Sequence, residues 1–262
     1  HYAQFVTLGF AALCIMAIKK NLGIARWHGP ADSIHAAHRT DNELDIKSGL
    51  SSTLVAFLSA SGGASVGQYG PLVHFGATIT EVLLKYIRIK FDRRVFIACG
   101  VAGAISAGFN APIAGVLFAH EALLRRFSIG AIAPIAVASI VAYAANQAFF
   151  NLEPMFSLPD MPIELQPLIP FLIFTGIFSA LTAVAYMAAI RKGRELATRS
   201  QWSLPKLLLS CVVVVGAIGV VVPDVAGLGL QQINQMLDAQ FGLGMLLVLL
   251  AGKIIGTAYC LN

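Results

Sequence analysis

The sequence predicts an all-helical integral membrane protein. Its 262 residues are 57% apolar and only 12% charged, and the mean hydropathy of +0.77 lies outside the usual range of soluble domains. The charged residues are bunched and leave long windows without any, namely Ser48–Thr80, Val95–His120, Phe127–Leu152, Leu165–Ile190 and Leu207–Pro223. Most of these windows exceed the roughly 20 residues with which a helix crosses about 30 Å of hydrocarbon. Several spanning helices are therefore expected.

The first elements are expected to be one apolar helix and one short amphipathic helix. The apolar segment Phe5–Ile18 ends at Lys19 and Lys20, and the stretch His28–Arg39 follows it. Pro30 lies near the start of that stretch, and the first turn of a helix accepts proline. Basic clusters such as Lys19-Lys20 produce the net charge of +5, and beside membrane spans such clusters set orientation. A nucleic-acid partner is therefore not expected.

The next two windows are each interrupted by a joint that a straight helix would not contain. The first joint, Ser61–Pro71, is rich in glycine, and the second, Gly108–Pro112, has helical sequence on both sides. Irregular backbone at membrane depth is tolerated only where protein or a water-filled cavity satisfies its polar groups. The N-terminus of a half-helix carries about half a positive charge. Two broken helices therefore predict a transport pathway for small anions.

The remaining apolar windows are each expected to form one span. These spans are Ile129–Phe150, Pro167–Ile190, Leu207–Val222 and Leu243–Leu261. A loop rich in proline and acids, Glu153–Pro167, separates the first of them from the others.

An enzyme, a metal site and a disulfide framework are not expected. The stretch Gly63–Gly67 matches the pattern of a hydrolase nucleophile elbow around Ser65, but it lies between membrane helices rather than between a strand and a helix. Four residues have helical spacing that could suggest a metal site, namely His28, Asp32, His35 and His38. We interpret them instead as polar residues on an exposed helix face, because no Cys or Glu-rich partner set accompanies them. The distant cysteines, namely Cys14, Cys99, Cys211 and Cys260, are interpreted as core or lipid-facing thiols.

Two stretches resemble motifs of the CLC chloride channel and transporter family. Gly67–Val73 (GQYGPLV) resembles the family motif Gly-Arg-Glu-Gly-Pro-x-Val, and Gly108–Glu121 (GFNAPIAGVLFAHE) is similar to the signature that follows it. The resemblance implies an inverted-repeat helical bundle with broken and re-entrant helices, several half-helix N-termini pointing at a central anion, and a homodimer with one pathway per subunit. Family members either conduct chloride passively or exchange it for protons.

The resemblance also assigns the anion pathway to particular residues. The early family motif Gly-Ser-Gly-Ile-Pro aligns loosely with Trp27–Ala31, so that His28 replaces the anion-binding Ser and Pro30 is displaced by one position. The predicted pathway residues are His28, Gly29, Pro30, Gly67, Gln68, Tyr69, Gly70, Pro71, Phe109, Asn110, Ala111 and Pro112.

An internal repeat predicts the domain organisation. Gly29–His35 resembles Leu228–Asn234 and pairs Ile34 with Ile233, so the second-half equivalent of the joint at Gly67 would fall beyond the end of the sequence. We expect residues 1–152 to form a first membrane repeat that lacks its N-terminal start. Residues 153–166 are expected to form a connecting loop, and residues 167–262 an incomplete second repeat of a longer transporter.

Departures from the family motifs favour passive conduction. The family's gating Glu is replaced by Tyr69, a phenol with an ordinary pKa of about 10 that stays neutral at pH 7. The internal proton-carrying Glu of the family aligns with Ala122. A chloride channel is therefore the leading hypothesis. An antiporter with relocated carriers remains open, because His74, His120 and Glu121 form a possible proton relay.

Several single residues keep two readings. Tyr69 is either a gate or an aromatic plug, and Gln68 either serves the pathway or caps a backbone group. Glu121 is either a proton carrier or the partner of Arg125 in an i,i+4 ion pair.

The expected surroundings are a lipid bilayer, a bacterial inner membrane and a chloride-like anion, with no cofactor, no metal and no nucleic acid.

Overall fold

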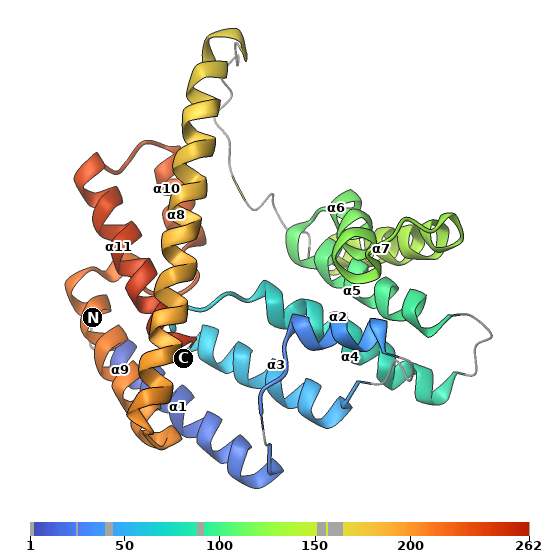
Figure 1. Ribbon diagram of the computed structural model, residues 1–262, viewed down its shortest axis with the longest axis horizontal. Coiled ribbons are helices and arrows are strands. Elements are labelled where there is room, and N and C mark those ends of the chain that lie inside the picture. The colour runs from blue at the N-terminus through green and yellow to red at the C-terminus, as the bar shows by residue number, and fades with distance from the viewer. Residues whose placement is uncertain are drawn as a thin grey trace. The chain divides into compact units, whose positions relative to one another are not determined.

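A computed structural model describes residues 3–24, 26–39, 44–87, 92–150, 156 and 165–261, and these residues form helices joined by short turns (Figure 1). The helices are α1 (Ala3–Leu22), α2 (Pro30–His38), α3 (Ile46–Ser61), α4 (Tyr69–Tyr86), α5 (Arg93–Phe109), α6 (Pro112–Phe118), the π-helix η1 (Ala119–Leu124), α7 (Ile129–Phe150), α8 (Leu165–Ser200), α9 (Leu204–Val221), the 3-10 helix η2 (Pro223–Val225), α10 (Leu230–Leu237) and α11 (Leu243–Cys260). Of the described helices, α1, α7, α8, α9 and α11 are long and apolar enough to cross a membrane. The predicted all-helical membrane class is confirmed.

Both predicted joints are present. The first window separates into α3 and α4 between Ser61 and Tyr69, and the second separates into α5 and α6 between Phe109 and Pro112. One predicted span is longer than its apolar window, because α8 continues past Ile190 through a basic segment to Ser200. A helix needs no apolar side chains to continue beyond the hydrocarbon, so the hydropathy window underestimates its length.

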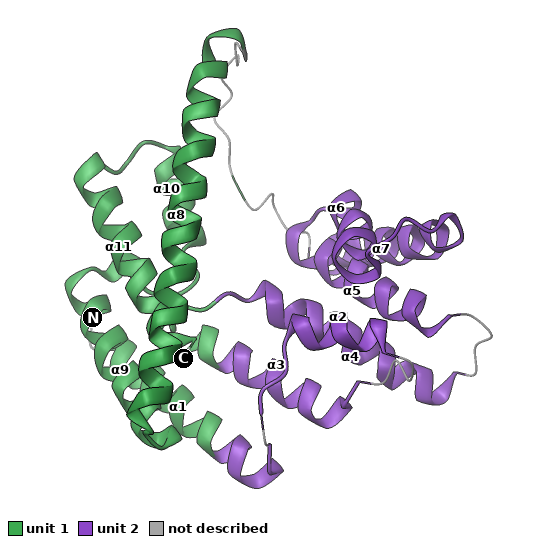
Figure 2. Ribbon diagram, in the orientation of Figure 1, with its two compact units in different colours: residues 1–16, 59–66, 156–262 green, residues 17–58, 67–155 purple. Residues whose placement is uncertain are grey.

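The described residues pack into two compact units (Figure 2). One unit holds residues 1–16, 59–66 and 156–262, and the other holds residues 17–58 and 67–155. These units reflect packing, whereas the predicted boundaries at 152 and 167 describe a sequence repeat, which stays a prediction. The predicted loop 153–166 lies outside the described residues except for residues 156, 165 and 166.

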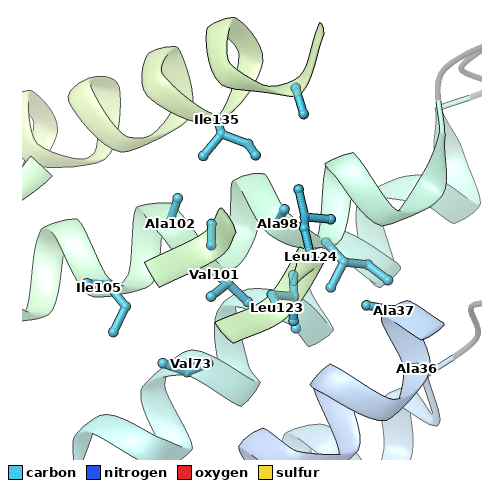
Figure 3. Packing of buried hydrophobic residues seen from close by; sticks show 14 of the residues in the cluster. Ala36, Ala37, Val73, Ala98, Val101, Ala102, Ile105, Leu123, Leu124 and Ile135 are labelled. Carbon is cyan, nitrogen blue, oxygen red and sulfur yellow. The ribbon is translucent and has the colours of Figure 1, made fainter. Parts of the chain in front are cut away.

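Helix α5 lies at the centre of the second unit. Its buried residues Ala98, Val101 and Ala102 belong to one apolar cluster with residues of α2, α4, η1 and α7. Figure 3 shows Ile135 of α7 on one side of α5 and Leu123 of η1 on the other. Between membrane helices, close van der Waals packing replaces the hydrophobic effect as the main attraction, and small side chains favour it. The alanine-rich sequence of α5 suits this central place.

Glycines allow the tightest contacts of α5. A Cβ on Gly76 of α4 would lie 2.4 Å from the carbonyl oxygen of Gly100, and a Cβ on Gly115 of α6 would lie 2.5 Å from the carbonyl oxygen of Ala102. Both distances are too short for any side chain. The backbones of α4 and α6 can therefore contact α5 directly.

Buried serines link α5, α6 and α7. Ser106 on α5 donates its hydroxyl hydrogen to the carbonyl of Ser139 on α7, with an Oγ–O distance of 2.7 Å. Ser139 donates in turn to the carbonyl of Pro112 at the start of α6, also at 2.7 Å. Hydrogen bonds of this kind are a usual supplement to packing between membrane helices. The start of α6 is thereby tied to two neighbouring helices.

The first unit is held by similar close contacts. A Cβ on Gly216 of α9 would lie 2.4 Å from the ring of Phe5 on α1. Ser65 and Thr257 share a hydrogen bond of 3.0 Å between their hydroxyl oxygens. The sulfur atoms of Cys211 and Cys260 lie 3.5 Å apart as free thiols. All four cysteines are half-buried, so these two lie between helices rather than on a bare lipid face.

The contact between α4 and α5 makes a stability prediction. Gly76→Ala would place a methyl group against the Gly100 carbonyl, so we expect a loss of unfolding free energy on the order of 1–3 kcal/mol. Thermal unfolding of the detergent-solubilised protein, followed by size-exclusion chromatography, measures it. Gly130→Ala in α7 is the control, because its Cβ would meet open space. Equal melting temperatures of the two variants would contradict this packing.

Candidate functional site

The starts of three helices meet at one cavity in the second unit. The cavity has a volume of about 500 Å³ and is lined by Pro30, Tyr69, Gly70, Val73, Ile105, Phe109, Ala111, Ala114 and Phe118. Pro30 is the first residue of α2, Tyr69 is the first residue of α4, and Ala111 immediately precedes α6. Five of the twelve residues predicted for the anion pathway therefore line the cavity. The other seven lie beside these in sequence, namely His28, Gly29, Gly67, Gln68, Pro71, Asn110 and Pro112.

Proline marks each of the three helix starts. Pro30 and Pro112 are the first residues of α2 and α6, and Pro71 lies in the first turn of α4. The first N–H groups of a helix have no partner within the helix, so proline costs no hydrogen bond there. These local signals can be read from sequence, and they explain why the helices begin where they do.

The cavity lining contains no charged side chain. The nearest positive partial charges are those of the helix N-termini, each equivalent to about half a unit charge, and the one at α2 is offset by Asp32. Such a site can hold a small anion through backbone N–H groups without burying a permanent cation. A larger, strongly hydrated anion would find few polar side chains in this lining to replace its water.

Tyr69 packs against Phe109 in the wall of the cavity. Their ring centroids lie 3.8 Å apart with an interplanar angle of 21°, which is a stacked pair. Gly108 allows this approach, because a Cβ there would lie 2.4 Å from Leu72 and 3.6 Å from the Tyr69 ring. Whether Tyr69 acts as a plug or as a gate, its aromatic ring forms part of the cavity wall.

Asn110 holds the joint between α5 and α6. Its backbone is left-handed, with φ 56°, a conformation in which Asn is several-fold enriched among residues other than Gly. Its side-chain oxygen accepts a hydrogen bond from Gln147 of α7 at 2.7 Å, and Asn146 donates to the carbonyl of Ala107 at 3.0 Å. Sequence reasoning missed Asn146 and Gln147, whose only signal is polarity at the end of an apolar helix.

The start of α2 already carries an anion of its own. The carboxylate of Asp32 accepts a hydrogen bond from the backbone N–H of Gly29 at 2.8 Å and one from Arg26 at 2.5 Å. A carboxylate at this position stabilises a helix N-terminus. Asp32 therefore competes with a cavity anion for the positive end of α2. The sequence interpretation had treated Asp32 as exposed helix polarity.

The candidate proton carriers do not gather at Tyr69. His74 is 1% exposed and pairs through Nδ1 with the Ser33 hydroxyl at 2.6 Å. His120 is also 1% exposed, but it stacks on Phe127 with ring centroids 5.2 Å apart. Glu121 is exposed. The structure places His74 one residue from Val73, which lines the cavity, and brings neither His120 nor Glu121 to it.

Two of the readings left open for single residues are wrong. Glu121 and Arg125 form no ion pair among the described residues, because the chain turns into a π-helix at Ala119 and Arg125 is left-handed, with φ 53°. The i,i+4 geometry of an α-helix is thereby lost. Gln68 occupies the position before α4 but makes no side-chain capping hydrogen bond.

The structure describes the surroundings of Ser65 and of the helix-spaced histidines. Ser65 is paired with the hydroxyl of Thr257 rather than with a His and an acid. Within the part of the chain that the structure describes, no three His, Cys, Asp or Glu side chains form a group suited to a metal ion. The residues His28, Asp32, His35 and His38 therefore do not converge on one point.

Comparison with known proteins identifies the family. The family model described as voltage gated chloride channel matches residues 9–262. The chain belongs to the voltage gated chloride channel (CLC) family. This match confirms the resemblance seen in the two motifs, and with the apolar helices it makes the chain an integral, multi-pass membrane protein.

CLC relatives come from several bacteria. A putative chloride channel protein, ClcB-like, of Ralstonia nicotianae is 25% identical over 237 residues, which cover 88% of this chain and 55% of that protein. The H(+)/Cl(-) exchange transporter ClcA of Vibrio cholerae is 30% identical over 208 residues, covering 76% of this chain and 44% of the transporter. The chain thus spans about half the length of these curated relatives.

The CLC fold is shown by structural comparison. The crystal structure of a slow cyanobacterial Cl⁻/H⁺ antiporter superposes with a TM-score of 0.80 and 18% sequence identity. The match covers 99% of this chain and 62% of the antiporter chain. The helix order described above is therefore that of a CLC protein, and the predicted fold class is confirmed.

The left-handed backbone of Asn110 makes a prediction about the joint. Asn110→Ala and Asn110→Gly both lose the hydrogen bond from Gln147, but only alanine strains the left-handed conformation. We expect Asn110→Ala to be the less stable variant by about 1 kcal/mol. Thermal unfolding in detergent measures the difference. Equal stabilities would mean that residue 110 is not held in this conformation.

Proposed function

We propose that this chain forms the anion-conducting part of a CLC protein and that its cargo is chloride or a similar small anion. The observation that carries the proposal is the cavity at which α2, α4 and α6 begin. The positive ends of α4 and α6 at one small cavity are suited to an anion and repel a cation, whereas the start of α2 is offset by the carboxylate of Asp32. The family match supports the same cargo class.

Passive conduction is the first candidate mechanism. Tyr69 occupies the gate position of the family motif, and its neutral ring is stacked on Phe109. Its side chain is a phenol rather than a carboxylate, so it cannot compete with chloride as the family's Glu does. The position of the family's internal Glu is taken by Ala122. With neither carboxylate present, anion movement has no obvious coupling to protons.

Proton-coupled exchange is the second candidate. The Vibrio cholerae relative is named as an H(+)/Cl(-) exchange transporter, and the superposed cyanobacterial structure is of a Cl⁻/H⁺ antiporter. Exchange in this chain would need proton carriers other than Tyr69 and Ala122. His74 is a buried titratable group whose sequence neighbour Val73 lines the cavity.

The rest of the proposal concerns the surroundings of the chain. We place it in the inner membrane of a bacterium, since the named relatives are from Ralstonia and Vibrio. We further propose a homodimer, by the resemblance to the family, with no cofactor and no enzymatic activity. Voltage dependence, which the family description names, is part of the same proposal.

Vesicles separate the two mechanisms. With the natural full-length protein reconstituted into liposomes, we expect chloride to flow down its gradient without uphill movement of protons. A chloride electrode and an internal pH dye record both fluxes, and protein-free vesicles are the control. Uphill proton movement driven by chloride would establish exchange. The absence of anion flux under every gradient would overturn the transport proposal itself.

Restoring the missing carboxylate tests the position of Tyr69. We expect Tyr69→Glu to make chloride flux pH-dependent, with inhibition at high pH, because the ionised carboxylate competes with chloride and its protonation relieves the block. Flux at pH 5 and pH 8 measures the effect. Tyr86→Glu is the matched control, since Tyr86 lies at the exposed end of the same helix, 83% accessible. A flat pH response of Tyr69→Glu would place Tyr69 away from the gate.

A further inference from the structure

A buried polar cluster lies where α2, α3 and α4 pack together in the second unit. Ser33, Ser52, His74 and Thr78 are between 0% and 6% exposed. Thr78 is satisfied locally, because its hydroxyl donates to the carbonyl of His74 at 2.7 Å. Ionisable groups inside a membrane protein are costly and usually functional. The imidazole of His74 is therefore the member of the cluster that requires an explanation.

His74 has one ring nitrogen paired and one unpaired. Its Nδ1 lies 2.6 Å from the Ser33 hydroxyl oxygen, whereas its Nε2 is buried and has no hydrogen-bond partner among the described residues. Gly49 of α3 makes room for this nitrogen, because a Cβ there would lie 3.3 Å from Nε2. Whichever tautomer is present, one nitrogen of a neutral imidazole donates and the other accepts. His74 thus keeps an unused hydrogen-bonding position in the protein interior.

A second imidazole faces the first. The ring of His28 meets the ring of His74 edge to face, with centroids 6.1 Å apart. Its Nδ1 is also buried without a partner among the described residues, and its backbone N–H is held by the hydroxyl of Ser52 at 2.8 Å. Either imidazole of the pair offers a nitrogen at which one proton can bind. Like charges at this separation disfavour a second proton.

Residues close in sequence to the pair line the cavity. His28 precedes Pro30 by two residues and His74 follows Val73, and both Pro30 and Val73 line the cavity. The two segments are in contact, since a Cβ on Gly70 would lie 3.3 Å from the Pro30 ring. A positive charge on the pair would therefore add to the positive end of α4, whereas the start of α2 is offset by Asp32.

Carboxylates near the pair are already engaged. Asp32 on α2 is bound by Arg26 and by the N–H of Gly29. The Ser48 hydroxyl, which donates to Asp45 just before α3, lowers the pKa of that carboxyl and keeps it charged. Other charged or titratable groups on the packed elements are His35 and His38 on α2, Lys47 on α3, Lys85 on α4, and Glu81 of α4 paired with Arg93 of α5.

We propose that His28 and His74 form a proton-binding site whose single proton strengthens anion binding in the adjacent cavity. A hydronium ion in the surrounding water donates the proton: one of its O–H bonds breaks, a water molecule is left, and an N–H bond forms at the ring nitrogen that carries the lone pair in the neutral tautomer. By linkage, a bound anion must raise the proton affinity of the pair by the same factor. The proton site stands on its own geometry, and its effect on anions rests on the proposed function.

A merely structural His74 is the competing explanation. In that case the imidazole only ties α2 to α4 through Ser33, and it stays neutral at every pH at which the protein is folded. The two explanations differ in charge rather than in fold. A readout of protonation therefore decides between them, whereas loss of stability in a variant does not.

Nitrogen NMR of the natural full-length protein labelled with ¹⁵N-histidine tests the proton site directly. In chloride-free detergent solution between pH 4.5 and 8, we expect the signals of the pair to show uptake of one proton. In His28→Gln the remaining His74 should titrate at a pH higher by about half a unit or more, because a like charge has been removed. His74→Gln assigns the signals. If it fails to fold, His28→Gln and Ser33→Ala carry the test.

Chloride added to the same samples tests the link to the cavity. We expect saturating chloride to move the titration of the pair to higher pH, and chloride to bind about fivefold or more tightly at pH 5 than at pH 8, which is the lower end of usual coupling. His35→Gln is the matched control and should keep both effects, because His35 is exposed on the same helix.

The outcomes are distinguishable. If the pair keeps its neutral signature across the whole pH range with and without chloride, the proton site is wrong. If the pair titrates but chloride leaves its midpoint unchanged while vesicles show chloride flux, the link to the cavity is wrong. If vesicles show no anion flux at any pH, the proposed function fails, and the chloride-free titration still decides the proton site.

Discussion

The close approach of small residues around α5 is the contact on which the candidate site depends. Gly76 and Gly115 bring the backbones of α4 and α6 directly against α5, and Ser139 ties the start of α6 to α7. Without these contacts the starts of α4 and α6 would have no fixed separation. Because the lining holds no charged side chain, the electrostatics of the cavity depend on where these backbones lie.

This dependence on backbone is consistent with an uncharged residue, Tyr69, in the cavity wall. Tyr69 contributes an aromatic surface and is fixed by its stack on Phe109, so it shapes the cavity without adding charge. The charged and titratable side chains closest in sequence to the lining residues lie outside the lining. Asp32 offsets the start of α2, and the unpartnered nitrogens of His28 and His74 offer a place for a proton. These charged and titratable side chains near the cavity are therefore not part of its lining.

Much of the fold follows from local patterns. Hydropathy windows predicted the spans, and glycine and proline predicted both joints, because these signals act within a few residues of where they occur. The family motifs predict Tyr69 and Phe109 for one anion pathway, and the two rings are stacked in one cavity wall. The end of α8 was not predicted, because hydropathy falls after Ile190 while the helix continues to Ser200. The π-helix η1 was not predicted either, because no change in hydropathy marks it.

The sequence by itself determined the membrane class and the helix starts, and its resemblance to the family motifs predicts that Tyr69 and Ala122 replace two carboxylates. Only the tertiary structure decided that Asn110 is held by Gln147, that Asp32 caps the start of α2, and that His28 faces His74. These pairings join side chains from different elements or depend on cap geometry. They follow from how closely helices approach, which is set by packing over the whole unit and not by any periodicity along the chain.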